Sequence, residues 1–275
     1  MGKDLPKKEF FSYVRKLKES HYPYAPQWLK TRSGKFLVGW HGRPYYMTEW
    51  VTGRALNREP EDYVSLGKAL GHLHKLRRIH RTPTPPYTQQ RIKTFKAQSH
   101  LFQQHLNYIR HKNNESSRWL EKHGEHCVQL SNEAWGILQD PKVKRLLARE
   151  KRHPTLVHGD VTIPNIVIHH RGLFLIDWDC LRTESMYYEV AKTLANTTAF
   201  KPALIDGFLQ GYEAIRPLKS SERLLISALF RFPREAWNVA RKTVTGRSYH
   251  ELDILDETWS DRLNAIIHLD EWAKR

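Results

Sequence analysis

The sequence is poor in cysteine and contains no long hydrophobic run. Its two cysteines, Cys127 and Cys180, are too few for a disulfide framework, and their spacing does not suit a metal site. A transmembrane helix needs about 18 or more consecutive apolar residues, and no such run occurs. The amino-terminal stretch MGKDLPKKEFF lacks the apolar core of a secretory signal. We therefore expect a cytoplasmic protein in a reducing environment.

Acidic residues are few compared with basic ones, 29 against 45, which gives a formal net charge of +16. Such a charge can attract nucleic acid, an anionic surface or an anionic small substrate. The basic residues are spread over the whole chain, however, and no zinc-finger, RNA-recognition or basic-heptad motif accompanies them. The pattern favours a solvated basic surface, so we expect neither nucleic acid nor a membrane as a partner.

The hydrophobic periodicity predicts helices with a few short strands between them. Helices are expected over residues 7–19, 62–76 and 88–150, the last with breaks near 113–114, 124 and 140–141, and again from 186 onward. Strands are expected over residues 36–40 and 45–51, joined by a turn, and over 155–157, 166–169 and 173–176. This order indicates an α+β fold with a small first lobe, residues 1–52, and a large helical second lobe, residues 53–275.

The stretch LVHGDVTIPNIVIHHRGLFLIDWDC, residues 156–180, carries the strongest functional signal. In it, Asp160 is followed five residues later by Asn165, and Asp177 ends the last predicted strand. Phosphoryl transfer requires a carboxylate that faces the attacking hydroxyl, and oxygen ligands that share Mg²⁺ with the phosphates. A loop followed by a hairpin can place Asp160 toward an acceptor while Asn165 and Asp177 face one metal ion. The spacing therefore indicates a phosphotransferase that uses ATP and Mg²⁺.

Two motifs, HGDVTIPN and LIDWD, resemble those of the aminoglycoside phosphotransferase and choline kinase superfamily, in which HGD replaces the His-Arg-Asp of protein kinases. The segments YYMTEWVTG and ALGHLHKL are similar to the hinge of those enzymes and to the first long helix after it. The likeness is greatest to the bacterial spore-coat kinase-like branch. It implies a protein-kinase-like two-lobe fold, with a truncated small N-lobe and a large helical C-lobe. The implied activity is transfer of the γ-phosphoryl group of ATP to a hydroxyl of an unidentified small molecule.

The resemblance also implies roles for individual residues. The catalytic base is expected at Asp160. The residues expected to bind the metal ion, an amide and two carboxylates, are Asn165, Asp177 and Asp179. The residues expected to bind the nucleotide, on the hinge and on the first helix, are Met47, Glu49, Trp50, Val51 and Glu9.

The family pairs the helix glutamate with a lysine on an earlier strand, and this lysine is missing here. Only eight residues precede Glu9, so Lys3, Lys7 and Lys8 cannot lie on a separate strand, and no G-x-G-x-x-G phosphate loop occurs. The resemblance thus implies that the first three strands are absent, which weakens ATP binding, or that the true start of the chain lies upstream. The remaining two-stranded sheet is expected to be mobile, or to expose an edge that a protein partner or a second copy covers.

Two other interpretations remain open at this point. His158, His169 and His170 could form a zinc site with Asp160 and Asp177, although neighbouring residues on a strand point to opposite faces. The chain could also be a catalytically weak or inactive kinase-like protein with a structural or binding role, such as a spore coat protein. The high positive charge disfavours polycationic aminoglycosides as acceptors.

Several conspicuous side chains have a plainer interpretation. Trp178 and Trp237 are expected to pack in the core. His158 is expected to be a structural hydrogen-bonding residue behind the loop. His72 and His74 lie on different faces of one predicted helix, where we expect them to pack or to face solvent.

Overall fold

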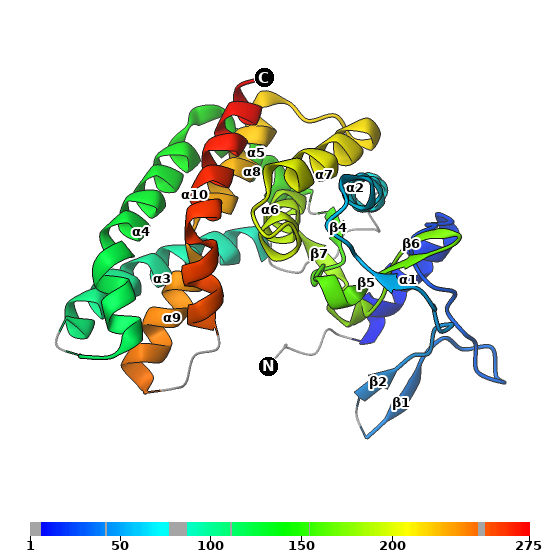
Figure 1. Cartoon of the computed structure of the whole chain (residues 1–275). Helices are drawn as coiled ribbons and strands as arrows, with labels where there is room; N and C mark the ends of the chain where they lie inside the picture. Colours follow the sequence, from blue (N-terminus) through cyan, green and yellow to red (C-terminus); the bar gives the residue numbers. More distant parts are fainter. Residues whose placement is uncertain (1–6, 42, 77–86, 111, 154, 247–250) are drawn as a thin grey trace. The chain divides into compact units, whose positions relative to one another are not determined.

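The computed structural model describes residues 7–41, 43–76, 87–110, 112–153, 155–246 and 251–275. The chain forms two compact units (Figure 1). The first, which we call the loop unit, comprises Met1–Pro85, Pro154–Thr198 and Ala203–Pro217. The second, the helical unit, comprises Pro86–His153, Ala199–Pro202 and Leu218–Arg275. No helix in the described part of the chain is long and apolar enough to cross a membrane.

The loop unit combines short antiparallel strands with helices (Figure 1). Its helices are α1 (Lys7–Glu19), α2 (Pro60–Lys75), α6 (Met186–Thr197) and, from Ala203 on, α7 (Pro202–Ile215). Its strand pairs are β1 (Val38–Trp40) with β2 (Arg43–Tyr45), and β4 (Thr155–Val157) with β7 (Arg182–Glu184). A further sheet has the order β3 (Arg54–Ala55), β5 (Ile166–His169), β6 (Gly172–Leu175). The segment between β4 and β5 is the predicted catalytic loop, and its two ends are therefore anchored in different sheets.

Aromatic packing places the core of the loop unit directly behind this loop. The ring of Trp178 is fully buried, edge-on to Tyr22 and 4.5 Å from the ring of His158. Its indole N–H donates to the carbonyl of Leu175 at 2.8 Å. The hydroxyl of Tyr22 donates to the carbonyl of Ala69 in α2 at 3.0 Å, which ties the segment after α1 to α2. The expected core position of Trp178 is confirmed.

The hairpin predicted around residues 41–44 is present, but its strands are shorter than expected. The chain that follows β2 pairs instead with an upstream segment that the sequence pattern did not reveal. The N–H of Leu29 donates to the carbonyl of Met47 at 2.9 Å, and the N–H of Glu49 donates to the carbonyl of Gln27 at 2.8 Å. This upstream segment pairs with the chain after β2, whereas β1 and β2 themselves form a two-stranded sheet, as expected. That a partner or a second copy covers an edge of this sheet stays a prediction.

The helical unit contains α3 (Tyr87–Ile109), α4 (Glu115–Gln139), α5 (Pro141–Arg152), α8 (Ser220–Arg231), α9 (Arg234–Thr245) and α10 (Glu251–Lys274). The break expected at Gly124 is wrong, because α4 runs through it. A Cβ at this position would lie 2.7 Å from a methyl group of Leu106, so the glycine serves close packing of α3 against α4. Trp237 is buried beside the rings of Phe95 and Phe232, which confirms its expected core position.

Most predicted elements agree with the structure to within two residues, as α1, α2 and the strands β4, β5 and β6 show. The structure adds β3 and β7, which have two and three residues and are too short to give a periodic signal. The mixed fold, with small sheets and extensive helix, agrees with the predicted class. The predicted lobe boundary at residues 52 and 53 stays a prediction, because the loop unit groups segments from both predicted lobes.

Candidate active site

The predicted catalytic loop turns sharply at Gly159, immediately after β4. This residue has φ of +87°, a left-handed conformation that favours glycine. A Cβ here would lie 2.1 Å from Nη1 of Arg182 and 2.4 Å from the carbonyl oxygen of Cys180. Both the conformation and the lack of space therefore require glycine in the HGD motif.

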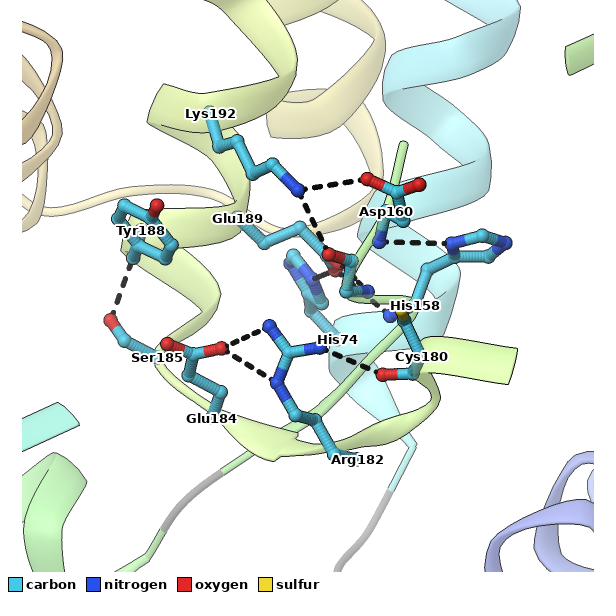
Figure 2. A network of polar contacts seen from close by, with 11 residues as sticks. His74, His158, Asp160, Cys180, Arg182, Glu184, Ser185, Tyr188, Glu189 and Lys192 are labelled. Carbon is cyan, nitrogen blue, oxygen red and sulfur yellow. Dashed lines mark hydrogen bonds and ion pairs between the residues drawn. The ribbon is translucent and has the colours of Figure 1, made fainter. Parts of the chain in front are cut away.

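His158 is completely buried behind the loop (Figure 2). Its Nε2–H donates to the carbonyl of Ile176 at 3.0 Å, and its Nδ1 accepts the N–H of Asp160 at 3.3 Å. Burial lowers the pKa of His158, which outweighs the opposite effect of Glu189, so the ring is neutral with the proton on Nε2. This arrangement confirms the expected structural role.

The zinc alternative is not supported by the geometry. Both ring nitrogens of His158 are engaged in hydrogen bonds. Among the described residues, no group of three or more His, Cys, Asp or Glu side chains is placed to hold a metal ion. A site that uses one amide and two carboxylates is a different case, and its residues are considered below.

Glu189 of α6 organises the loop from beneath, and sequence reasoning missed it. Its carboxylate accepts the backbone N–H of Gly159 at 2.5 Å and that of His158 at 3.3 Å (Figure 2). It also accepts Nε2–H of His74 at 2.8 Å, while Nδ1 of His74 accepts the hydroxyl of Tyr212 at 2.8 Å. We expected His74 to be a packing or surface residue. The structure shows instead that it is a buried link between α2 and α6.

The charge state of this buried pair follows from its hydrogen bonds. Burial acts to raise the pKa of Glu189, but the bonds from His74 and Gly159 outweigh it and hold the pKa below its usual value. Burial lowers the pKa of His74, although Glu189 opposes the shift. A neutral His74 that donates from Nε2 to an ionised Glu189 satisfies both groups. The loop therefore rests on a permanent buried carboxylate.

Asp160, the expected base, lies at the open side of the loop with its side chain 41% exposed. Its Oδ1 is 3.0 Å from Nζ of Lys192, which extends from α6 (Figure 2). The amide nitrogen of Asn165 donates to the carbonyl oxygen of Asp160 at 2.9 Å and approaches its Oδ2 at 3.3 Å. The structure thus brings Asp160 and Asn165 together and fixes the orientation of the amide.

The two acidic residues after β6 lie on the wall of a cavity. Asp177 has φ of +58° and begins the 3₁₀ turn Trp178–Cys180, which turns the chain so that Asp177 and Asp179 both border this cavity. The hydroxyl of Tyr46 is hydrogen-bonded to Asp179, and burial together with this bond raises the pKa of Tyr46 far above its usual value. Tyr46 was also missed, because a tyrosine in a strand-like run gives no functional signal.

This cavity has a volume of about 960 Å³ and lies wholly within the loop unit. The residues that border it include Glu49, Trp50 and Val51 of the predicted hinge, and Asp177 and Asp179 of the acidic turn. The carboxylate of Glu49 accepts the N–H of Gln27 at 3.1 Å and lies 3.7 Å from Arg171, so its side chain serves the fold. The carbonyl groups of the hinge are better suited than this carboxylate to meet a base.

The remaining predicted site residues lie apart from this wall. Met47 is not among the residues that border the cavity, and its side chain is 69% exposed. Asp160 and Asn165 do not border it either, whereas Ile163 and Pro164, between them in the chain, do. Glu9 belongs to α1, but its side chain lies outside the described part of the structure.

A family model described as the phosphotransferase enzyme family matches residues 6–225. The chain belongs to this phosphotransferase family. A search of the curated proteins finds no match. Several solved structures are similar in fold over nearly the whole chain, and three of them are described here.

An aminoglycoside phosphotransferase from Alicyclobacillus acidocaldarius is 18% identical, with a TM-score of 0.87 over 98% of this chain and 85% of that one. A spectinomycin phosphotransferase in complex with ADP and spectinomycin is 15% identical, with a TM-score of 0.58 over 96% and 78% of the two chains. A choline/ethanolamine kinase family protein from Mesorhizobium loti is 12% identical, with a TM-score of 0.51 over 98% and 83%. At these identities the likeness shows the fold alone. The match of the family model to residues 6–225 confirms the predicted phosphotransferase superfamily. The spore-coat branch stays a prediction.

Proposed function

We propose that this protein is an ATP- and Mg²⁺-dependent phosphotransferase that transfers the γ-phosphoryl group to a hydroxyl of a small molecule. The observation that carries the proposal is the cavity of about 960 Å³, which both the hinge segment and the acidic turn border. A nucleotide has a flat base and a charged phosphate chain, and these two segments suit its two ends. Membership of the phosphotransferase family supports this, as does ADP in the structure of the similar spectinomycin phosphotransferase.

The donor set fits Mg²⁺, which prefers hard oxygen ligands and shares them with phosphates. Asp177 and Asp179 offer carboxylate oxygens at the cavity wall. The amide nitrogen of Asn165 donates to Asp160, so its amide oxygen is the atom that would bind the metal ion. Bound by these residues, Mg²⁺ would neutralise charge on the phosphate oxygens. The hydroxyl of Tyr46 engages Asp179, which suits a supporting role for this carboxylate beside Asn165 and Asp177.

Asp160 is the proposed base. Its carboxylate is partly exposed, so an acceptor hydroxyl can reach it, and it is held by Asn165 and Lys192. In the reaction the hydroxyl proton passes to Asp160 as the oxygen attacks the γ-phosphorus, and ADP leaves with the electrons of the broken P–O bond. The buried bonds from Gly159 and His158 to Glu189 keep the loop backbone fixed while this occurs.

The first test is nucleotide binding, measured as thermal stabilisation with and without Mg²⁺. At a hundredfold excess over its dissociation constant, Mg²⁺–ATP stabilises a protein by about 2.7 kcal/mol, a shift on the order of 5 °C for a chain of this size. We expect Asp177→Ala to remove the Mg²⁺-dependent part of the shift. Asp253→Ala, which alters an exposed carboxylate on α10, is the control. The absence of any shift at millimolar Mg²⁺–ATP would contradict the proposal.

The alternative, a weak or inactive kinase-like binding protein, is favoured by one observation. Both carboxylate oxygens of Asp160 already have partners, which limits its readiness to accept a proton. Release of inorganic phosphate from Mg²⁺–ATP, with water as the acceptor, distinguishes the two. An enzyme should lose about a hundredfold or more of this activity in Asp160→Asn while it retains nucleotide binding. Binding without any hydrolysis, in wild type and variant alike, would establish the alternative.

A further inference from the structure

One helix holds both backbone polar groups of a single residue in the loop, the N–H and the carbonyl of Gly159. Glu189 and Lys192 are three residues apart in α6, so they share a face of the helix. Glu189 accepts the N–H of Gly159 at 2.5 Å, and Nζ of Lys192 donates to the carbonyl of the same residue at 3.0 Å. Figure 2 shows the two side chains pointing from α6 to the loop. The spacing of Glu189 and Lys192 on one face of α6 therefore determines how the loop is held.

Lys192 also contacts Asp160, the proposed base. A second N–H of its ammonium group donates to Oδ1 of Asp160 at 3.0 Å. A nearby cation, Arg182, is engaged elsewhere, with Glu184 and with the carbonyl of Cys180, as Figure 2 shows. Arg182 is thus not placed to take over the contact with Asp160.

We propose that Lys192 is a positioning residue, which aims the carboxylate of Asp160 at the acceptor hydroxyl. The inference rests on the proposed function. One oxygen of the carboxylate is held by Lys192 and the other, more loosely, by Asn165, and together they fix the plane of the group. Without Lys192, the carboxylate of Asp160 can rotate about its side-chain bonds, because its remaining side-chain bond at 3.3 Å is long. Catalysis depends on such orientation far more than folding does.

The exposure of the pair separates this role from a structural one. The side chains of Lys192 and Asp160 are 24% and 41% exposed, and exposed ion pairs contribute little to folding. The chain offers a control in Lys201, whose ammonium group pairs with Asp261 at 2.6 Å, with side chains 47% and 37% exposed. Loss of the Lys201 pair removes a lysine–aspartate pair without touching the loop.

The test measures phosphate release from Mg²⁺–ATP by Lys192→Met, Lys192→Arg and Lys201→Met. We expect Lys192→Met to lower kcat by about tenfold or more, with KM for ATP and the melting temperature nearly unchanged. Lys192→Arg should recover most of the loss, because it retains the cation, and Lys201→Met should match the wild type. In an Asp160→Asn background, Lys192→Met should cause no further loss. Equal kcat in wild type and Lys192→Met, or a loss that Arg does not relieve, would overturn the proposal.

A second readout does not depend on turnover. In ¹H–¹⁵N spectra selective for lysine ammonium groups, Lys192 should give a resolved signal that is absent in Lys192→Arg and shifts in Asp160→Asn. A signal insensitive to Asp160→Asn would show that the pair does not form, and would overturn the inference whatever the activity. If the wild type binds Mg²⁺–ATP without hydrolysing it, the proposed function fails, and the ammonium signal still shows whether Lys192 holds Asp160.

Discussion

Both units of the molecule bury a charged group, and the two groups are used differently. In the loop unit one such group is the carboxylate of Glu189, which accepts N–H groups from the catalytic loop and from His74. In the helical unit one is the guanidinium of Arg262, which is 1% exposed and donates to the carbonyls of Phe230 and Phe232. The carboxylate of Glu189 accepts hydrogen bonds from a loop that contains the partly exposed carboxylate of Asp160. The guanidinium of Arg262 donates to carbonyl groups at the end of a helix.

The partners of each charge explain this difference. The carbonyls that Arg262 binds belong to the end of α8 and to the residue after it, where helical partners run out. The rings of Phe200 and Phe230 flank its guanidinium at 5.2 and 5.8 Å, and Glu235 supplies the counter-charge at 2.9 Å. All of these contacts are made between residues of the helical unit. Around Glu189, in contrast, the chain of contacts continues through Gly159 to Lys192 and Asp160 at the surface.

The largest effect is expected from Glu189→Ala. It leaves two loop N–H groups and His74 without their acceptor in a dry environment, a loss of about 3–5 kcal/mol in the free energy of unfolding. Urea unfolding measures this loss, and phosphate release by the fraction that stays folded should fall as well. Glu189→Gln, which keeps one acceptor oxygen, should be milder in both respects. Full activity in Glu189→Ala would show that the loop does not need its buried support.

Arg262→Met is expected to cost somewhat less, about 2–3 kcal/mol. Methionine keeps much of the packing volume against the two phenylalanine rings, and the stranded partner Glu235 is 36% exposed and can be hydrated. The comparison predicts a further difference, because the folded protein should retain its phosphate release. Activity and urea unfolding are measured on the same preparation. An Arg262→Met variant that is folded but inactive would contradict the proposal that the buried charge of the helical unit does not support activity.

A smaller effect is expected from pH, and its main part should come from two completely buried histidines of the loop unit. Burial lowers the pKa of His74 and of His158 in the folded protein. As the pH falls below about 6.5, the unfolded chain takes up protons that the folded histidines resist. Stability that is present above this pH is therefore lost below it, by up to about 1.4 kcal/mol per pH unit for each histidine.

Urea unfolding between pH 7.5 and 5 measures this loss. The slope should be smaller in His158→Gln, which removes one of the two groups, and should keep its wild-type value in Arg262→Met. A stability that rises toward pH 5 would contradict the assignment of neutral buried histidines.

The smallest effect is expected from Lys201→Met, which removes an ion pair on the surface. The two side chains are 47% and 37% exposed, so water and salt screen their attraction. The free energy of unfolding should change by about 0.5 kcal/mol or less, and added salt should remove the difference. A loss comparable to that of Arg262→Met would mean that the exposed fraction of an ion pair does not predict its contribution to the free energy of unfolding.

The sequence predicted those parts of the site whose signal is local. The spacing of Asp160, Asn165 and Asp177 lies within one loop and one hairpin, and the structure has that loop and hairpin. The helices were predictable because amphipathic periodicity extends over many residues. The assignment of Asp160 as the base, and of Asn165, Asp177 and Asp179 as metal ligands, stays a prediction until the experiments above are done.

The supporting residues were not predictable because their partners lie far away in the chain. Glu189 contacts a backbone group 30 residues away and a side chain 115 residues away. In the sequence it is one glutamate on an amphipathic helix, where a solvent-facing position is the ordinary interpretation. Lys192 and Tyr46 give equally little signal. The glycine that permits α3 to pack on α4, Gly124, was even misleading, because a glycine inside a helical pattern usually suggests a break.

The contact between Gly159 and Glu189 has a consequence for exchange of the loop amides with solvent. The Gly159 N–H belongs to no sheet or helix, and by position alone it would be expected to exchange its hydrogen for deuterium quickly. Its partner, however, is a carboxylate 4% exposed, so exchange requires that the loop lift away from α6. We therefore expect the Gly159 amide to exchange as slowly as the amides of the adjoining strands, although it lies in a loop.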